Sequence, residues 1–278
     1  MVVLNLTSEE FLTGQLRYKH SAFPDGQQSI DIVVSDPQTF YNLRNSEINE
    51  GVKIMSRMNS FKDVELIVCA NQALKNIGFK EIELFVPYFL GARSDRKFVK
   101  GGVNYIKDVI APIINLQGFS KVTVVDPHSD VLEACLNNFE KEDNKELVRF
   151  ALMKYWSLNN KIISDMSNVV FVSPDAGALK KVYNISESFS SVNDVIVCSK
   201  HRDVDGKLSK TTVPLTDDIM EKDLFIVDDI CDGGGTFINI AKEIKSNENF
   251  KGRLYLIVTH GIFSRGFEDL SDYFTNIY

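Results

Sequence analysis

The chain has 278 residues, of which 44% are hydrophobic and 25% are charged. This composition is that of a globular protein and excludes disordered and collagen-like chains. No apolar run approaches the ~18 residues of a membrane-spanning helix, so we expect no membrane partner. The formal net charge of −7 argues against a general nucleic-acid binder. At about 100–200 residues per domain, the length fits one large or two medium domains.

The four cysteines are widely spaced along the chain, which leaves no pair with zinc-site spacing: Cys69, Cys135, Cys198 and Cys231. The first three lie among apolar residues. The segment Met1–Thr7 is too short for a secretory signal and lacks a basic start. We therefore expect reduced, mostly buried thiols in a cytoplasmic protein.

Short apolar, β-branched runs alternate with helical patterns along the chain. The expected strands are Ile30–Val34, Val52–Arg57, Glu81–Val86, Val122–Val125, Asn168–Val172, Val195–Cys198, Leu224–Val227 and Leu254–Val258. The expected helices are Phe61–Asn76, Val103–Leu116, Val131–Phe139, Ala178–Tyr183 and Phe237–Ser246. Near-continuous apolar strands that alternate with helices predict parallel sheets covered on both faces. The predicted fold class is therefore α/β.

The stretch Asn138–Glu146 is the most polar part of the chain. We interpret it as the boundary between two domains, residues 1–145 and 146–278. The alternative is a solvated loop or helix face inside one domain.

Three of the expected strands end in polar loops that carry aspartates. These loops contain Asp126-Pro127-His128, Ser173-Pro174-Asp175 and Asp228-Asp229. Because ligands of open α/β sheets bind beyond the carboxyl ends of the strands, these loops are where we expect the chemistry.

The most informative segment follows the strand Leu224–Val227. Asp228, Asp229 and Asp232 lead into Gly233-Gly234-Gly235-Thr236 and an apolar helix. Glycines let backbone N–H groups crowd around an anion, and a helix N-terminus adds its positive end. Thr236 could cap that helix and offer its hydroxyl to a phosphate. The acids would repel a bare phosphate, so we expect them to bind sugar hydroxyls or a metal beside it.

This acidic, glycine-rich loop resembles the phosphoribosyl pyrophosphate motif of type I phosphoribosyltransferases and ribose-phosphate pyrophosphokinases. Further segments resemble the pyrophosphokinases in particular, and they follow one another in the order found in that family. They are Phe23–Gln27, Pro87–Lys97, Val125–His128, Val172–Gly177 and Thr259–Ser264. The resemblance implies two tandem phosphoribosyltransferase-type domains, each a mainly parallel sheet flanked by helices.

The family transfers the β,γ-diphosphate of Mg-ATP to the anomeric hydroxyl of ribose 5-phosphate and releases AMP. By resemblance, His128 and Asp175 would hold Mg²⁺ and the ATP phosphates. The residues expected to bind ATP are Phe23, Asp25, Gln27, Arg93, Asp95, Arg96 and Lys97. The structural alternatives are a plain turn at residues 23–27 and a solvated charge run at residues 93–97.

Lys200-His201-Arg202 opens a polar stretch that runs to Thr212 and looks like a mobile loop. By resemblance, Lys200 and Arg202 would close over the transferring diphosphate and stabilise the transition state, together with His128. The alternative is an exposed basic turn.

The resemblance also assigns the acceptor site. Asp228 and Asp229 would bind the ribose 2- and 3-hydroxyls, and the backbone of Asp232–Thr236 would cradle the 5-phosphate. The site's residues are then Asp228, Asp229, Asp232, Gly233, Gly234, Gly235 and Thr236.

The chain departs from the family pattern at several positions. The usual loop reads Asp-Thr-x-Gly-Thr, so Gly233 removes a hydroxyl that would help bind a terminal phosphate. Ser94 replaces a glutamine, Phe98 an acid and Gly101 an arginine. The resemblance therefore does not extend to the usual phosphate-effector site. Family members also continue beyond the position of Tyr278, which suggests a shortened form.

These departures leave the acceptor open between ribose 5-phosphate, the default, and an extended acceptor such as ADP-ribose. Two other functions are considered. A phosphoribosyltransferase would use phosphoribosyl pyrophosphate as donor, and a regulatory pyrophosphokinase-associated protein would be non-catalytic. The retained His128, Asp175, Lys200 and Arg202 argue against the latter. We expect small-molecule substrates and a homo-oligomer.

Overall fold

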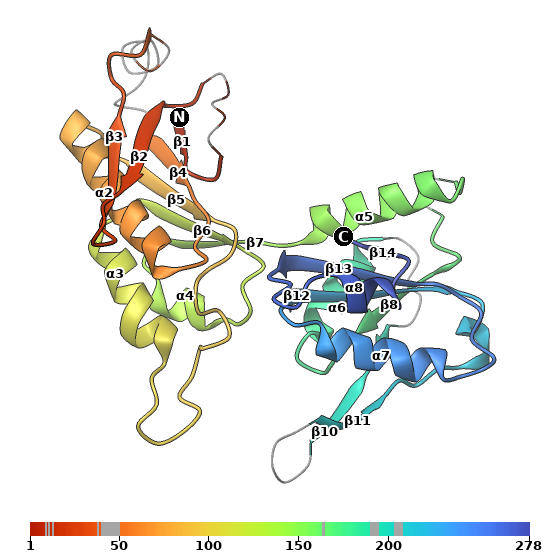
Figure 1. Ribbon diagram of the computed structural model, residues 1–278. Helices are drawn as coiled ribbons and strands as arrows, with labels where there is room; N and C mark the ends of the chain where they lie inside the picture. Colours follow the sequence, from red (N-terminus) through yellow and green to blue (C-terminus); the bar gives the residue numbers. More distant parts are fainter. Residues whose placement is uncertain are drawn as a thin grey trace. The chain divides into compact units, whose positions relative to one another are not determined.

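The computed structural model describes residues 1–8, 10, 12, 14–37, 39, 51–162, 165–189, 195–202 and 208–278, with the backbone alone for 200–202 and 208–210. The chain forms two compact units, Met1–Glu142 and Asp143–Tyr278, each described by itself (Figure 1). Their boundary lies three residues before the one expected from the sequence. No helix within the described ranges combines the length and apolarity needed to cross a bilayer.

The first unit contains a parallel five-stranded sheet in the order β1-β4-β5-β6-β7. Its strands are β1 (Val2–Asn5), β4 (Val52–Met55), β5 (Ile82–Val86), β6 (Lys121–Val125) and β7 (Phe139–Glu142). The helices are α2 (Phe61–Ile77), α3 (Ala111–Leu116), which continues the π-helical turn η2 (Ile106–Ile110), and α4 (Val131–Cys135). A separate antiparallel hairpin consists of β2 (Tyr18–Ala22) and β3 (Gln28–Ile32).

The second unit repeats the same layout with strand order β14-β13-β12-β8-β9, again all parallel. Its strands are β8 (Val169–Ser173), β9 (Ile196–Val197), β12 (Asp223–Cys231), β13 (Leu254–Gly261) and β14 (Asn276–Ile277). The helices are α5 (Lys145–Leu158), α6 (Leu179–Glu187), α7 (Gly235–Lys245) and α8 (Glu268–Ser271), with a 3₁₀ turn η3 (Asp217–Ile219). The hairpin of β10 (Ser199–Arg202) and β11 (Leu208–Thr212) projects from this sheet (Figure 1).

Alternate residues of the second sheet pack on opposite faces, as the two-residue period of a strand requires. On one face Leu224 and Ile226 pack in a cluster with Ile240 of α7. On the other face Phe225 and Val227 share a cluster with residues of α5 and α6. Both faces are therefore covered by helices, and the predicted α/β class with parallel sheets is confirmed.

Several elements of the structure differ from those expected from the sequence. The polar stretch taken as a boundary contains β7, an edge strand whose Glu140–Glu142 are exposed, and the first turn of α5. The amphipathic helix α5, with Val148, Leu152 and Tyr155 buried, was not recognised behind that polar start. The sequence predicts a loop from Lys200 to Thr212. The described part instead forms the β10–β11 hairpin, with a register shift between His201 and Arg202.

A buried carboxylate joins the elements of the second unit at the start of β12. Asp223 is 2% exposed. Its oxygens accept hydrogen bonds from Tyr155 Oη of α5 at 2.7 Å, Asn168 Nδ2 at 3.1 Å and Arg253 Nη2 at 2.8 Å. Burial alone would raise the pKa of Asp223, but the hydrogen bonds from Arg253 and Tyr155 outweigh it and lower the pKa.

We expect Asp223→Asn to destabilise the second unit by about 2–4 kcal/mol at pH 7, since it removes one charge from a buried ion pair whose arginine is still partly solvated. A carboxyl whose pKa is lowered by folding stabilises the protein above its unfolded pKa, and this contribution is lost as the pH falls through the folded pKa. The difference between wild type and variant should therefore shrink below about pH 4.

The measurement is urea unfolding followed by the fluorescence of Trp156, the single tryptophan, which lies buried on α5. The control is Asp272→Asn, because Asp272 is exposed. An Asp223→Asn variant as stable as the control at pH 7 would show that the network does not hold the unit together.

Candidate active site

Three parallel strands of the second unit bring their carboxyl ends to one edge of the sheet. Asp175 follows β8, Asp228 and Asp229 lie near the end of β12, and residues 262–267 follow β13. The pairings β12·β8 and β12·β13 make these segments neighbours. The structure therefore places Asp175, Asp228 and Asp229 at one edge of the sheet, as the sequence predicts.

Asp228 and Asp229 form a pair of carboxylates at the end of a buried strand. The backbone N–H of Asp229 donates to Asp228 Oδ1 at 2.9 Å. Burial, the negative charge of Asp229 and the nearby charge of Asp175 raise the pKa of Asp228 well above its ordinary range. Such a pair gains stability from a cation or from hydroxyl donors, which is the chemistry expected of a sugar or metal site.

Lys181 of α6 offsets part of this charge. Its Nζ lies 3.4 Å from Asp229 Oδ2, and Asp229 is 5% exposed. The sequence analysis did not identify Lys181, because only the packing of α6 against the sheet brings it to Asp229.

The side chain of Asp175 stabilises the loop in which it lies. Asp175 Oδ1 accepts hydrogen bonds from the backbone N–H groups of Gly177 and Ala178 at 3.0 and 3.1 Å. The buried hydroxyl of Ser173 donates to the carbonyl oxygen of Asp175 at 2.7 Å. This Asx turn fixes the carboxylate near the Asp228–Asp229 pair.

The glycine loop leads directly into α7. The cap residue is Gly234, whose φ of +74° favours glycine, and the helix begins at Gly235. Thr236 was expected to cap this helix; it lies instead within the first turn, because the left-handed Gly234 ends the loop two residues earlier. The first N–H groups of α7 lack helical acceptors and can bind an anion.

The segment after β13 packs on the glycine loop. Ser264 Oγ donates to Asp232 Oδ1 at 2.6 Å. The backbone N–H groups of Ile262 and Phe263 donate to the carbonyl oxygen of Cys231 at 2.8 and 3.2 Å. The sequence analysis noted this segment as a family match but assigned no role to its residues.

In the first unit, the loops after β5 and β6 meet at Asp95. Asp95 is 5% exposed, and its Oδ1 accepts a hydrogen bond from Arg96 Nε at 3.1 Å. Burial would raise the pKa of Asp95, but hydrogen bonds from Ser129 and Arg96 and the charges of Arg96 and His128 lower it. Asp95 thus links the loop that carries Arg93, Arg96 and Lys97 to the loop that carries His128.

The basic side chains of this loop face solvent, as a binding role for a polyphosphate requires. Arg93, Arg96, Lys97 and His128 are all exposed. Lys97 Nζ lies 4.0 Å from Asp108 Oδ2. The nearby Asn104 Nδ2 donates to the carbonyl oxygen of Asp95 at 2.6 Å and fixes the loop. Contact of these residues with ATP stays a prediction.

The segment Phe23–Gln27 is the turn of the β2–β3 hairpin. The backbone N–H of Phe23 donates to the carbonyl oxygen of Gln27 at 2.9 Å, and Gln27 N–H donates to Asp25 Oδ1 at 3.1 Å. Phe23 is 51% exposed. These hydrogen bonds lie within the turn, so they do not place it beside the Arg93–Lys97 loop.

Lys200 and Arg202 lie on β10, and their side chains are outside the described residues. Backbone pairing joins Lys200 to Thr211 and Arg202 to Leu208. Their predicted role in catalysis therefore rests on the resemblance.

The predicted Mg²⁺ ligands come from different units, His128 from the first and Asp175 from the second. Within the described ranges, no group of three or more His, Cys, Asp or Glu side chains is arranged to hold a metal. The carboxylates of Asp175, Asp228 and Asp229 are nonetheless the hard oxygen donors that Mg²⁺ prefers, and Mg²⁺ commonly binds through one or two carboxylates plus substrate phosphates. Asp175, one of the two predicted ligands, is a donor that fits the ion.

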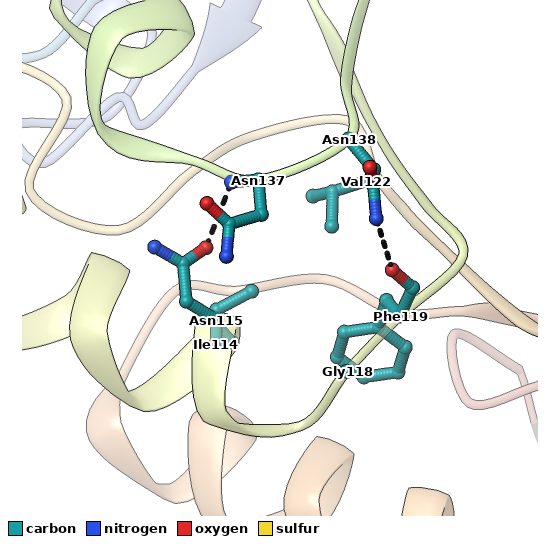
Figure 2. Close-up of a pocket in the computed structure, with 7 residues that line it drawn as sticks. All are labelled: Ile114, Asn115, Gly118, Phe119, Val122, Asn137 and Asn138. Carbon is teal, nitrogen blue, oxygen red and sulfur yellow. Dashed lines mark hydrogen bonds between the residues drawn. The ribbon is translucent and has the colours of Figure 1, made fainter.

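A small cavity in the first unit lies away from these loops. It has a volume of about 90 Å³ and is lined by Ile114, Asn115, Gly118, Phe119, Val122, Asn137 and Asn138 (Figure 2). Asn115 Oδ1 accepts from the backbone N–H of Asn137 at 2.9 Å, and Asn138 Nδ2 donates to the carbonyl oxygen of Phe119 at 2.9 Å. Val122 is near the amino end of β6, opposite the His128 loop. The amides thus serve to join loops.

Comparison with known proteins supports the reading of both units. A family model described as the phosphoribosyl transferase domain matches residues 147–261. A ribose-phosphate pyrophosphokinase of Mycoplasmopsis pulmonis is 29% identical, with 77% of this chain and 61% of that protein covered. One of Ureaplasma parvum is 30% identical (72% and 57% covered). One of Sulfurisphaera tokodaii is 27% identical (89% and 77% covered).

The fold is also that of a solved structure, phosphoribosylpyrophosphate synthetase from Mycobacterium smegmatis. The TM-score is 0.73 at 17% identity, with 93% of this chain and 78% of that chain covered. The matched region spans about three fifths of the length of the curated relatives first compared. Similarity to these relatives extends through both units, so the chain belongs to the ribose-phosphate pyrophosphokinase family.

Proposed function

We propose that this protein transfers the β,γ-diphosphate of Mg-ATP to the anomeric hydroxyl of a 5-phosphoribosyl acceptor and releases AMP. The observation that carries the proposal is the juxtaposition of the Asp228–Asp229 pair with the glycine loop and the start of α7. Carboxylates suit sugar hydroxyls, and the N–H groups of the loop suit a phosphate. The relatives named ribose-phosphate pyrophosphokinase support the same reaction.

In the proposed reaction, the anomeric oxygen attacks the β-phosphorus and forms a new O–P bond. The bond between the β-phosphorus and the oxygen bridging to the α-phosphorus breaks, AMP leaves with that oxygen, and the hydroxyl proton is released. Bound Mg²⁺ would neutralise phosphate charge. The family resemblance assigns its binding to His128 and Asp175.

The chain's own groups would act mainly by positioning. Asp228 and Asp229 would orient the ribose by accepting its 2- and 3-hydroxyl hydrogen bonds. Arg93, Arg96 and Lys97 would bind the ATP phosphates, while Phe23 would stack on adenine with Asp25 and Gln27 at the base or sugar. Lys200 and Arg202 would stabilise charge on the transferring diphosphate.

For the acceptor we propose ribose 5-phosphate as the default and ADP-ribose as a close second. A terminal phosphate at neutral pH carries about −1.5 to −2 charge and three acceptor oxygens, so it benefits from every donor. A bridging phosphate has one charge and two free oxygens. The loop Gly233–Gly235 lacks side-chain hydroxyls, which weakens the preference for the terminal form.

We expect the reaction to require a divalent cation and to yield AMP. The assay incubates the protein with ATP, Mg²⁺ and either ribose 5-phosphate or ADP-ribose, without a nucleobase, and identifies the products by mass spectrometry. EDTA should abolish the reaction. ADP as the nucleotide product would contradict the proposal, and a reaction that needs phosphoribosyl pyrophosphate and a base would indicate a phosphoribosyltransferase.

We expect Lys200→Ala and Arg202→Ala each to lower kcat by about 10²–10³-fold, with a smaller change in KM for ATP, because groups that act on transition-state charge affect the rate preferentially. Initial rates at varied ATP provide the measurement. Lys154→Ala is the control, since Lys154 is exposed on α5. Near-normal kcat with a raised KM would make the hairpin a binding element.

Compared with Gly233→Ala, we expect Gly233→Thr to shift the ratio of kcat/KM values toward ribose 5-phosphate and away from ADP-ribose by about tenfold, the value of one hydrogen bond to a charged group. Gly233→Ala adds the Cβ without the hydroxyl and is the matched control. If Gly233→Thr leaves the ratio unchanged, Gly233 does not set the acceptor choice.

A further inference from the structure

The side chain of Arg265 lies along the backbone of Gly233 in the glycine loop. A Cβ atom at position 233 would be 3.3 Å from Arg265 Nε, 3.4 Å from Cδ and 3.6 Å from Cγ. Three consecutive atoms of the arginine therefore run over the face of the glycine. Because the guanidinium carbon is bonded to Nε, the planar donor group begins at the loop itself.

This position is fixed by the segment from which Arg265 projects. The preceding residue, Ser264, donates to Asp232 Oδ1 at 2.6 Å, and the N–H groups of Ile262 and Phe263 bind the Cys231 carbonyl. The segment also requires Gly261, where a Cβ would lie 1.9 Å from the Phe263 ring. Arg265 thus projects from a segment whose preceding residues are hydrogen-bonded to Cys231 and Asp232.

The charge around the glycine loop is negative, so binding a phosphate there requires a positively charged group. Asp228, Asp229 and Asp232 all lie in the strand and loop that would receive a phosphate. Lys181 is already paired with Asp229. Arg265 is exposed and forms no ion pair with the described part of the chain. A guanidinium also matches phosphate geometry through two parallel N–H bonds.

We propose that Arg265 is a specificity-determining residue whose guanidinium binds the 5-phosphoryl group of the acceptor at the glycine loop. This inference rests on the proposed function, since it concerns the same site. It also explains Gly233: a side chain there would occupy the space over which Arg265 lies. The shared chemistry is a 5-phosphoryl oxygen, from either ribose 5-phosphate or ADP-ribose.

The test is titration of the ¹⁵N-labelled protein with ribose 5-phosphate and, separately, ADP-ribose, observed at the backbone amides of Gly233–Gly235. These signals report binding at the loop without catalysis. We expect Arg265→Ala to raise the Kd of the bound acceptor by about 10–100-fold and Arg265→Lys to raise it less. Unphosphorylated ribose should bind wild type and Arg265→Ala equally. Arg149→Ala, an exposed arginine on α5, is the control.

The outcomes separate this inference from the proposed function. If the wild-type amides respond to an acceptor and Arg265→Ala binds it with unchanged Kd, Arg265 does not bind phosphate, although the proposed function stands. An equal loss of affinity for ribose would also overturn the inference, because the effect would then concern the whole site. If neither acceptor shifts the wild-type amides, the proposed function fails and the inference with it.

A double-mutant cycle tests the link between the two residues. Gly233→Ala should weaken ribose 5-phosphate binding when Arg265 is present, because the new Cβ pushes the arginine side chain aside. In the Arg265→Ala background the same change should have little further effect, which gives a clear coupling. Additive losses would show that Gly233 and Arg265 act independently and would overturn the shared-space explanation.

Discussion

Burial of parallel strands on both faces is the constraint on which the rest of the structure depends. In β12 the residues Asp223–Val227 are all buried, so neither face of the sheet can carry solvated chemistry. Polar groups must then collect where the strands end. Asp228 and Asp229 occupy that position, with the loops after β8 and β13 beside them through the parallel pairings. The candidate site therefore lies at the edge of the sheet where the buried strands end.

The pKa values of the carboxyl groups at the two ends of β12 are shifted in opposite directions. At the start, Asp223 is surrounded by donors, which lower its pKa and make the carboxylate part of the framework. At the other end, burial and Asp229 raise the pKa of Asp228. A carboxyl with a raised folded pKa stabilises the protein only while protonated, and this contribution is lost as the pH rises through the folded pKa. The fold therefore holds an acid pair in which the charged form of Asp228 is disfavoured and Asp229 lies beside Lys181.

Much of the framework could be predicted because short, near-continuous apolar runs can be recognised from the local sequence. Core strands such as β5 and β8 were placed within about one residue of their bounds. The ends were harder: β12 was expected to stop at Val227, yet its pairing with β13 continues to Cys231. Backbone pairing with the parallel strand β13 extends β12 past Asp228 and Asp229. Helix α5 was missed because its first turn is as polar as a linker, although its buried stripe follows a helical period.

The site residues could be predicted where they stand together in one segment of the sequence. They could not be predicted where only the packing of the fold brings them together. Asp228, Asp229 and the glycines stand together in the sequence, so the type of site could be inferred. The same was not true of Lys181 on α6 or Arg265 after β13, which reach the loop only through tertiary contacts. For Thr236 the residue type led to a wrong prediction. Threonine suits a helix cap, but the cap residue of α7 is Gly234, whose backbone is left-handed.

The candidate loops of the two units carry different charges, which match the two proposed substrates. The first unit exposes Arg93, Arg96 and Lys97, while its buried Asp95 is held by neighbouring side chains. Such a loop attracts a polyphosphate and has little to offer a sugar. At the end of β12 in the second unit, Asp228, Asp229 and Asp232 lie together, which suits hydroxyl donors and opposes any bare anion. A ribose that also carries a phosphate needs both environments within a few ångströms. In this unit the acids of β12 are followed directly by the glycine N–H groups, over which an arginine lies. The charge therefore changes from negative to positive along a single loop.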